Sequence, residues 1–163
     1  MSSQTLFDFS QNSNLHSWRV VNDDVMGGKS VGNFELSDEG HGLFYGEVST
    51  ENNGGFSSVR WTTSPIEIGD HTKIAFRLRG DGKDYQFRLK EKTEDRPSYI
   101  SSFHTTGEWQ IVEVAISELY PSFRGRRLEM PNFEASSFEE CAFLIANKQD
   151  ESFRLEIDWI ELR

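Results

Sequence analysis

Residues 71–90 read HTKIAFRLRGDGKDYQFRLK, and apolar and polar side chains alternate along most of this stretch. The apolar positions in it are Ile74, Phe76, Leu78, Tyr85, Phe87 and Leu89. A period of two predicts half-buried β-strands over 71–80 and 84–90. Asp81-Gly82 stands between the two runs, and this dipeptide is typical of a tight turn. The sequence therefore predicts that the two strands pair as a hairpin.

Other short runs of β-branched or aromatic residues are bounded by turn residues in the same way. They occur at 6–9, 18–21, 31–36, 43–49, 56–61, 99–104, 109–115, 141–147 and 152–163. Helical periodicity is weak, with one turn expected at 116–120 and another at 136–140. This pattern predicts an all-β fold, a jelly-roll β-sandwich of about ten strands with at most short helical turns. The length of 163 residues favours a single domain over 1–163.

The longest unpatterned region, 120–137, is expected to cross one end of the sandwich. It contains Arg124-Gly125-Arg126-Arg127, a basic cluster in an acidic chain, which we interpret as a charge-balancing surface loop. The chain carries a formal net charge of −10. This charge argues against nucleic acid and against an anionic membrane surface as partners. No apolar run is long enough to be inserted in a membrane.

Cysteine content and the first residues bear on the compartment. Cys141 is the single cysteine, so an intrachain disulfide and a thiolate zinc cluster are excluded. It stands in an apolar run, where a free cysteine behaves as a small buried hydrophobe. The N-terminal residues show neither a secretory signal nor an Arg-rich transit segment. We therefore expect a cytoplasmic protein.

Two stretches contain more polar residues and glycines than turns alone require, namely WRVVNDDVMGGKS at 18–30 and TENNGGFSSVRW at 50–61. We expect both Gly-Gly pairs to allow positive φ or close backbone approach. The surface of 20–30 and 51–60 is the predicted binding site. Its candidate partner- or ligand-binding residues are Asn22, Asp23, Asp24, Met26, Gly27, Gly28, Glu51, Asn52, Asn53, Gly54, Gly55, Phe56 and Arg60. Arg60 could recognise a carboxylate on a partner, but we favour a clamp that holds the loop of Glu51 or of Asp23.

Catalytic patterns are absent from the sequence. The four histidines are scattered singly, no Gly-x-Ser-x-Gly elbow occurs, and Gly27-Gly28-Lys29-Ser30 lacks the upstream glycine of a phosphate loop. Asp23 and Asp24 would point to opposite faces of an extended backbone, so they would not share a site. A calcium site using them is conceivable but unsupported. We predict no catalytic residue, no metal ligand and no cofactor, so the chain is not expected to be an enzyme.

The two glycine-rich stretches also carry a family resemblance. Trp18, the stretch 21–30 (VNDDVMGGKS), FYGEVS at 44–49 and 51–60 (ENNGGFSSVR) closely resemble motifs of the complex I intermediate-associated protein 30 family. The likeness continues through 123–126, 143–149 and 153–160, so it covers nearly the whole chain. The resemblance implies a galactose-binding-like jelly roll. It also implies an assembly factor or chaperone for respiratory complex I (NADH:ubiquinone oxidoreductase) that engages a protein partner. The chain looks like the short bacterial members.

Two alternatives to a protein-binding assembly factor stay open. One is a carbohydrate-binding module, which would need exposed aromatic platforms. The four tryptophans, Trp18, Trp61, Trp109 and Trp159, stand in patterned strands and look mostly buried. Two or more of them on an open concave face would favour sugar binding. The other alternative is an enzyme on a jelly roll, which a metal held by Asp23 and a histidine would support.

Overall fold

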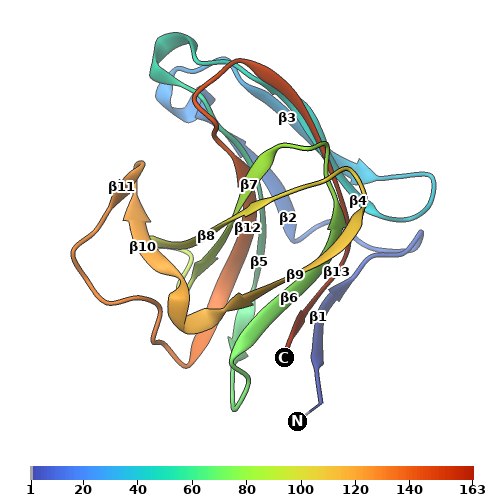
Figure 1. Cartoon of the computed structure of the whole chain (residues 1–163), viewed down its shortest axis with the longest axis vertical. Coiled ribbons are helices and arrows are strands. Elements are labelled where there is room, and N and C mark those ends of the chain that lie inside the picture. Colours follow the sequence, from blue (N-terminus) through green and yellow to red (C-terminus); the bar gives the residue numbers. More distant parts are fainter. Residues whose placement is uncertain (1) are drawn as a thin grey trace.

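The computed structural model describes residues 2–163, apart from the side chains of Val25 and Met26. In this part of the chain two antiparallel sheets face each other, as Figure 1 shows. One sheet has, in spatial order, β11 (Arg126–Arg127), β10 (Tyr120–Phe123), β8 (Ser98–His104), β7 (Asp84–Lys90), β12 (Ser137–Ile145), β5 (Ser57–Glu67) and β2 (Trp18–Asn22). The other has β3 (Val31–Leu36), β4 (Gly42–Val48), β13 (Glu151–Leu162), β6 (Lys73–Arg79) and β9 (Trp109–Ala115), with β1 (Gln4–Asp8) paired to β13.

Short 3-10 helices interrupt the strands at three places, η1 (Asp23–Met26), η2 (Glu51–Asn53) and η3 (Ile116–Glu118). The all-β jelly-roll prediction is confirmed, with thirteen strands among the described residues. The turn expected at 116–120 is confirmed as η3. The turn expected at 136–140 is wrong, because β12 begins at Ser137 and pairs with both β5 and β7. Region 120–137 also contains two strands, β10 and β11, that extend the seven-stranded sheet.

The predicted hairpin over 71–90 is wrong, although both of its strands exist. β6 pairs with β13 and β9 in one sheet, whereas β7 pairs with β8 and β12 in the other. The Asp81-Gly82 link therefore crosses between the sheets. Thr105 holds this crossover, since its hydroxyl donates to the carbonyl of Lys83 and accepts from the amide of Gly82. Both strands do turn an apolar face to the same core, and the rings of Phe76 and Phe87 stack 5.0 Å apart.

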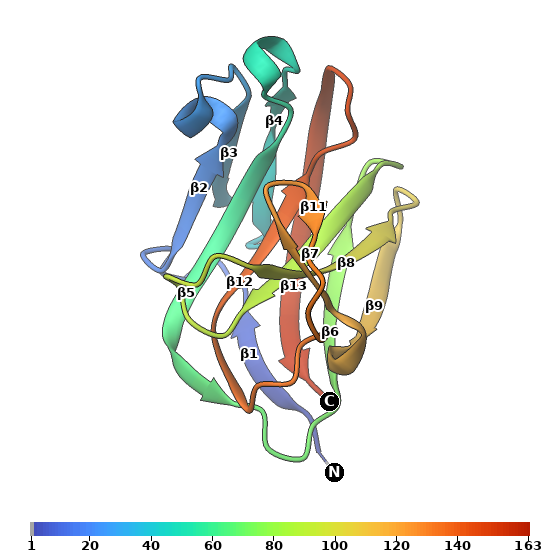
Figure 2. The ribbon, with the colours of Figure 1, turned by 90° about the vertical axis from the view of Figure 1, so that its left-hand side faces the viewer.

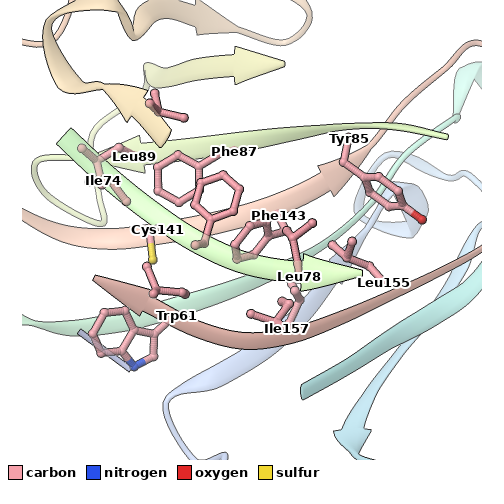
Figure 3. Close-up of a cluster of buried hydrophobic side chains, with 14 of the residues drawn as sticks. Trp61, Ile74, Leu78, Tyr85, Phe87, Leu89, Cys141, Phe143, Leu155 and Ile157 are labelled. Atoms are coloured by element: carbon pink, nitrogen blue, oxygen red, sulfur yellow. The ribbon is translucent and has the colours of Figure 1, made fainter. Parts of the chain in front are cut away.

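The core between the sheets is strongly aromatic. Figure 3 shows Phe87, Phe143 and Tyr85 packed among aliphatic side chains from both sheets. Cys141 is buried in this cluster, and burial raises the pKa of its thiol, as expected for a small hydrophobe. Trp18 and Trp61 also face the core, with rings 6.1 Å apart. Burying this much aromatic surface fixes the sandwich firmly enough to position loops at its ends.

Candidate binding site

The two glycine-rich stretches meet at one end of the sandwich. Figure 2 shows η1 and η2 together at the end opposite the two termini. The link from β2 to β3 contains η1, and the link from β4 to β5 contains η2. Since β2 and β5 belong to one sheet and β3 and β4 to the other, contacts between these links join both sheets.

Asp23 is the centre of these contacts, which we call the Asp23 clasp. Its Oδ1 accepts from the backbone N–H of Ser30 at 2.9 Å. Its Oδ2 accepts from the Ser30 hydroxyl at 2.5 Å and from the backbone N–H groups of Gly55 at 2.6 Å and Phe56 at 3.2 Å. The Ser30 hydroxyl also accepts from the Ser49 amide at 2.9 Å. One carboxylate thus ties together backbone segments that are more than thirty residues apart in the chain.

Burial and hydrogen bonding act in opposite directions on Asp23. The residue is 0% exposed, and burial alone would raise the pKa of its carboxyl group. Hydrogen bonds from Gly55, Ser30 and Phe56 outweigh burial and hold the pKa below its usual value. The carboxylate form is therefore the one that the fold stabilises. With its oxygens occupied and no exposed surface, Asp23 does not offer a contact to a partner.

Two glycines make room for the clasp. A Cβ added at Gly28 would lie 2.4 Å from the Asp23 carboxyl carbon, and one added at Gly54 would lie 2.5 Å from Oδ2. Close approach, rather than positive φ, is therefore what requires glycine at these two positions. Gly27 and Gly55 do have positive φ, 87° and 126°. The expectation that each Gly-Gly pair supplies positive φ or close approach is met by one residue of each kind per pair.

The other polar candidates either support the clasp or surround it. Asn22 is half-buried, and its Oδ1 accepts from the Ser57 hydroxyl at 2.5 Å. Asn52 and Asn53 adopt left-handed backbone conformations, and the Asn52 amide donates to the carbonyl of Gly27 at 3.0 Å. Phe56 is half-buried beside the clasp. The side chain of Met26 lies outside the described part of the structure.

Exposed side chains surround the buried carboxylate. The exposed residues at this end are Asp24, Gly27, Lys29, Glu51, Asn52 and Asn53, which we call the loop surface. Lys29 and Glu51 form an ion pair at 3.4 Å across the two links. Asp23 is buried and Asp24 is exposed, although they begin a 3-10 helix and do not lie on the extended backbone that was expected. Ser30 and Ser49, which were not among the candidate residues, complete the clasp, and Ser57 holds the adjacent Asn22.

Arg60 is not part of the clasp, so the clamp interpretation is wrong. It lies on β5, on the outer face of the seven-stranded sheet, and its Nε donates to the Ser58 hydroxyl at 3.4 Å. The charges that act on it belong to Glu140 and Arg19, neither of which is in the two loops. The alternation of β5 explains this, because neighbours Val59 and Trp61 face the core and turn Arg60 outward.

Metal ligands, membrane-spanning helices and exposed tryptophans are further features that would indicate a function. Among the described residues, no group of three or more His, Cys, Asp or Glu side chains is placed to hold a metal ion. In the same part of the chain, no helix is both long and apolar enough to cross a membrane. Trp109 and Trp159 are half-buried on the six-stranded sheet. They share the outer face of this sheet, since they stand opposite Arg79 and Arg77, whose neighbours Phe76 and Leu78 are buried. Trp18 and Trp61, in contrast, point into the core.

The two-sheet β-sandwich has the same fold as known carbohydrate-binding modules. The family 11 carbohydrate-binding module from Clostridium thermocellum, solved in complex with a β-1,3-1,4-mixed-linked tetrasaccharide, matches with a TM-score of 0.73 at 15% identity. The match covers 98% of this chain and 94% of that one. At this identity the likeness concerns the fold alone.

Sequence comparison, in contrast to the fold likeness, identifies the family of the chain. The family model for Complex I intermediate-associated protein 30 matches residues 7–157, so the chain belongs to that family. The mitochondrial Complex I intermediate-associated protein 30 of Drosophila melanogaster is 26% identical over 96% of this chain, and that of Mus musculus is 25% identical over 96%. The chain spans 62% and 55% of the length of these two relatives.

Proposed function

We propose that this chain is a non-catalytic binding protein that assists assembly of respiratory complex I by holding a protein partner at the loop surface. The name of its relatives refers to association with intermediates of that complex. The observation that carries the proposal is the Asp23 clasp, which fixes two polar loops in one conformation. Loops held in place on a rigid scaffold bind with a smaller loss of conformational entropy.

The loop surface offers chemistry suited to a polar protein contact. It combines charges of both signs at Asp24, Lys29 and Glu51 with the amides of Asn52 and Asn53. In this proposal Asp23 shapes the surface and does not touch the partner. The surface of the partner would then carry hydrogen-bonding and charged groups and need no deep apolar anchor.

A charge reversal on the loop surface tests the proposal. We expect Asp24→Arg combined with Glu51→Arg to leave the clasp intact and the melting temperature nearly unchanged while capture of complex I subunits is lost, because the exposed ion pair of Glu51 with Lys29 contributes little to stability. The measurement is affinity capture from the native cell followed by quantitative mass spectrometry. Glu118→Arg, an exposed position on η3, makes the same type of charge change away from the loops and serves as the control. Equal capture by both variants, or no complex I subunit captured by wild type, contradicts the proposal.

Carbohydrate binding is the second candidate, and the fold likeness supports it. Two half-buried tryptophans on the outer face of the six-stranded sheet could receive a sugar, but neighbouring arginines limit both. The guanidinium carbon of Arg163 lies 5.5 Å from the centre of the Trp159 ring, and those of Arg77 and Arg79 lie 4.4 Å and 5.1 Å from the centre of the Trp109 ring. Both rings are therefore already engaged in cation–π contacts. Titration with the mixed-linked tetrasaccharide checks this candidate, which predicts saturable binding that Trp109→Ala abolishes.

A further inference from the structure

A row of side chains crosses the outer face of the seven-stranded sheet. The antiparallel registers align residues from six neighbouring strands, namely Arg19, Arg60, Ala142, Arg88, Ile100 and Tyr120. Directly opposed residues of an antiparallel pair share one face of a sheet. This face is the outer one, because the flanking Val59, Phe87 and Phe143 are buried in the core. Register alone therefore gathers three arginines on one surface.

Arg60 and Arg88 stand on either side of Ala142. Adjacent strands are about 4.8 Å apart, so two strand spacings separate the two backbones by roughly 10 Å. Ala142 is small and buried, so no large side chain stands between the two arginines. Lys90, two residues beyond Arg88 on β7, adds a further cation on the same face. The charges of Arg60 and Arg88 act on each other and on Lys90.

A hollow of about 310 Å³ adjoins this row, and residues of β7, β8, β10 and β11 form its walls. Arg88, Gln86, Ile100, Tyr120, Ser122 and Arg127 line it. The guanidinium carbon of Arg127 lies 4.6 Å from the centre of the Tyr120 ring. Arg88 donates from Nε and Nη2 to the Gln86 side-chain oxygen at 3.0 Å and 2.8 Å. Since a guanidinium has five N–H donors, most of those of Arg88 are left for a ligand.

These cations have no carboxylate of their own. Within residues 2–163, no carboxylate oxygen lies within 4.0 Å of a charged nitrogen of Arg60, Arg88, Lys90 or Arg127. Burial, helped by the charge of Arg60, lowers the pKa of Arg88 to about 10, and burial also lowers the pKa of Arg60. The acidic groups that face the cluster are Asp95, which acts on Lys90, and the buried Glu140, which lies 3.7 Å from Arg19 and acts on both Arg60 and Lys90.

Arginines of the six-stranded sheet, unlike those of the row, form close ion pairs with carboxylates. Arg77 pairs with Asp158 at 2.5 Å, Arg79 with Glu156 at 2.7 Å and Arg163 with Glu113 at 2.7 Å. The chain has 27 acidic against 17 basic residues, so carboxylates are abundant. Within the described part of the chain, the half-buried guanidinium of Arg88 has no carboxylate acting on it, so no internal ion pair offsets its desolvation cost. An anion from outside the chain would offset it.

We propose that this hollow binds a small polyvalent oxyanion, a ligand whose phosphate or paired carboxylates face Arg88 and Arg127. Guanidinium forks match the geometry of both groups. Gln86 and Ser122 supply neutral hydrogen-bonding groups at the wall, and Tyr120 and Ile100 give an apolar surface for the body of the ligand. The hollow is at the small end of ligand sites, which suits a metabolite-sized molecule. This site is separate from the loop surface and does not depend on it.

Calorimetric titration at constant ionic strength tests the proposal, with inorganic phosphate and succinate as the two probes. We expect saturable binding of at least one probe at millimolar concentrations or below, accompanied by a rise in melting temperature. Phosphate binding alone assigns the phosphate chemistry, and succinate binding alone assigns the dicarboxylate chemistry. Binding of neither probe, or binding of the neutral mixed-linked tetrasaccharide in their place, overturns the proposal.

Matched arginine variants locate the binding. Arg88→Gln and Arg127→Gln should each weaken the bound probe about tenfold or more, because each removes charge-assisted hydrogen bonds. Arg163→Gln removes an arginine on the other sheet and should leave the affinity unchanged. Arg127 is exposed on a two-residue strand, so its variant keeps the test valid should Arg88→Gln fail to fold. Equal affinity for wild type, Arg88→Gln and Arg127→Gln overturns the assignment.

Discussion

The Asp23 clasp and the arginine row on the outer sheet face both remove charge from water, and they do so in opposite ways. Asp23 is completely buried, and four donors from its own chain meet its carboxylate. Arg60 and Arg88 are half-buried, and their side chains donate to the neutral groups of Ser58 and Gln86. A charge satisfied from within serves the fold. A charge left without a counter-ion is available to a ligand.

The largest effect expected from this contrast is the loss of Asp23. Asp23→Ala leaves two amides of the β4–β5 link and the amide and hydroxyl of Ser30 without their acceptor. Hydrogen bonds to a charged group contribute about 1.5–3 kcal/mol each, and buried donors left without an acceptor add a further cost, so a total loss of about 3–5 kcal/mol follows. We expect a loss of that size in the free energy of unfolding, measured by urea denaturation.

Asp24→Ala is the matched control for Asp23→Ala. The two residues are adjacent and of the same type, but Asp24 is exposed. Its truncation should change the free energy of unfolding by less than about 0.5 kcal/mol. Similar losses from the two variants would show that the clasp does not hold the loops, and the distinction between a structural and a ligand-facing charge would fail with it.

The pH dependence of stability is a smaller effect from the same carboxylate. Its pKa in the folded state lies below the ordinary value of 3.8, so the carboxylate contributes stability that is complete above that pH. The contribution is lost as pH falls through the lower, folded-state pKa. We expect the stability difference between wild type and Asp23→Asn to be constant near neutrality and to shrink below about pH 4.

Urea unfolding of both proteins between pH 7 and pH 2 measures this difference. Taking the difference removes the contributions of Glu113, Asp150 and Glu156, whose pKa values are also lowered by their own partners. A difference that grows as the pH falls would mean that the fold favours the protonated form of Asp23, contrary to the hydrogen bonds that it accepts.

Period-two alternation was enough to predict most strands, because it depends only on each strand having one buried face. The strands over 31–36, 84–90 and 109–115 begin and end at the predicted residues. Alternation does not say which sheet a strand joins. The Asp81-Gly82 link therefore looked like a hairpin although it crosses the core, and Thr105, which holds it, is more than twenty residues away in sequence.

The candidate site was also predicted only as far as local sequence allows, because contacts between distant segments decide which of its residues are buried. The two motifs marked segments that do meet in the folded chain, but nothing local separates Asp23 from Asp24. Only contact with Gly55 and Phe56 buries one of them. The arginine row was not predicted at all. Arg88 reads as the polar position of an ordinary strand, and its neighbours in the row come from strands that only the sheet register brings together.

A small change in stability is expected from the arginine row on the outer sheet face. Arg88→Leu removes a half-buried charge whose burial and proximity to Arg60 both lower its pKa. Without a ligand, its loss should change the free energy of unfolding by less than about 1 kcal/mol or raise it, because replacing an uncompensated buried charge with an apolar side chain relieves desolvation. Arg79→Leu is the matched variant for comparison with Arg88→Leu, since it deprives the buried Glu156 of a partner at 2.7 Å.

Urea unfolding in a phosphate-free buffer measures the free energy of unfolding of both variants, and Arg79→Leu should be clearly the more destabilising. If Arg88→Leu costs as much, the Arg88 charge is satisfied within the chain and the two regions do not differ in the way proposed.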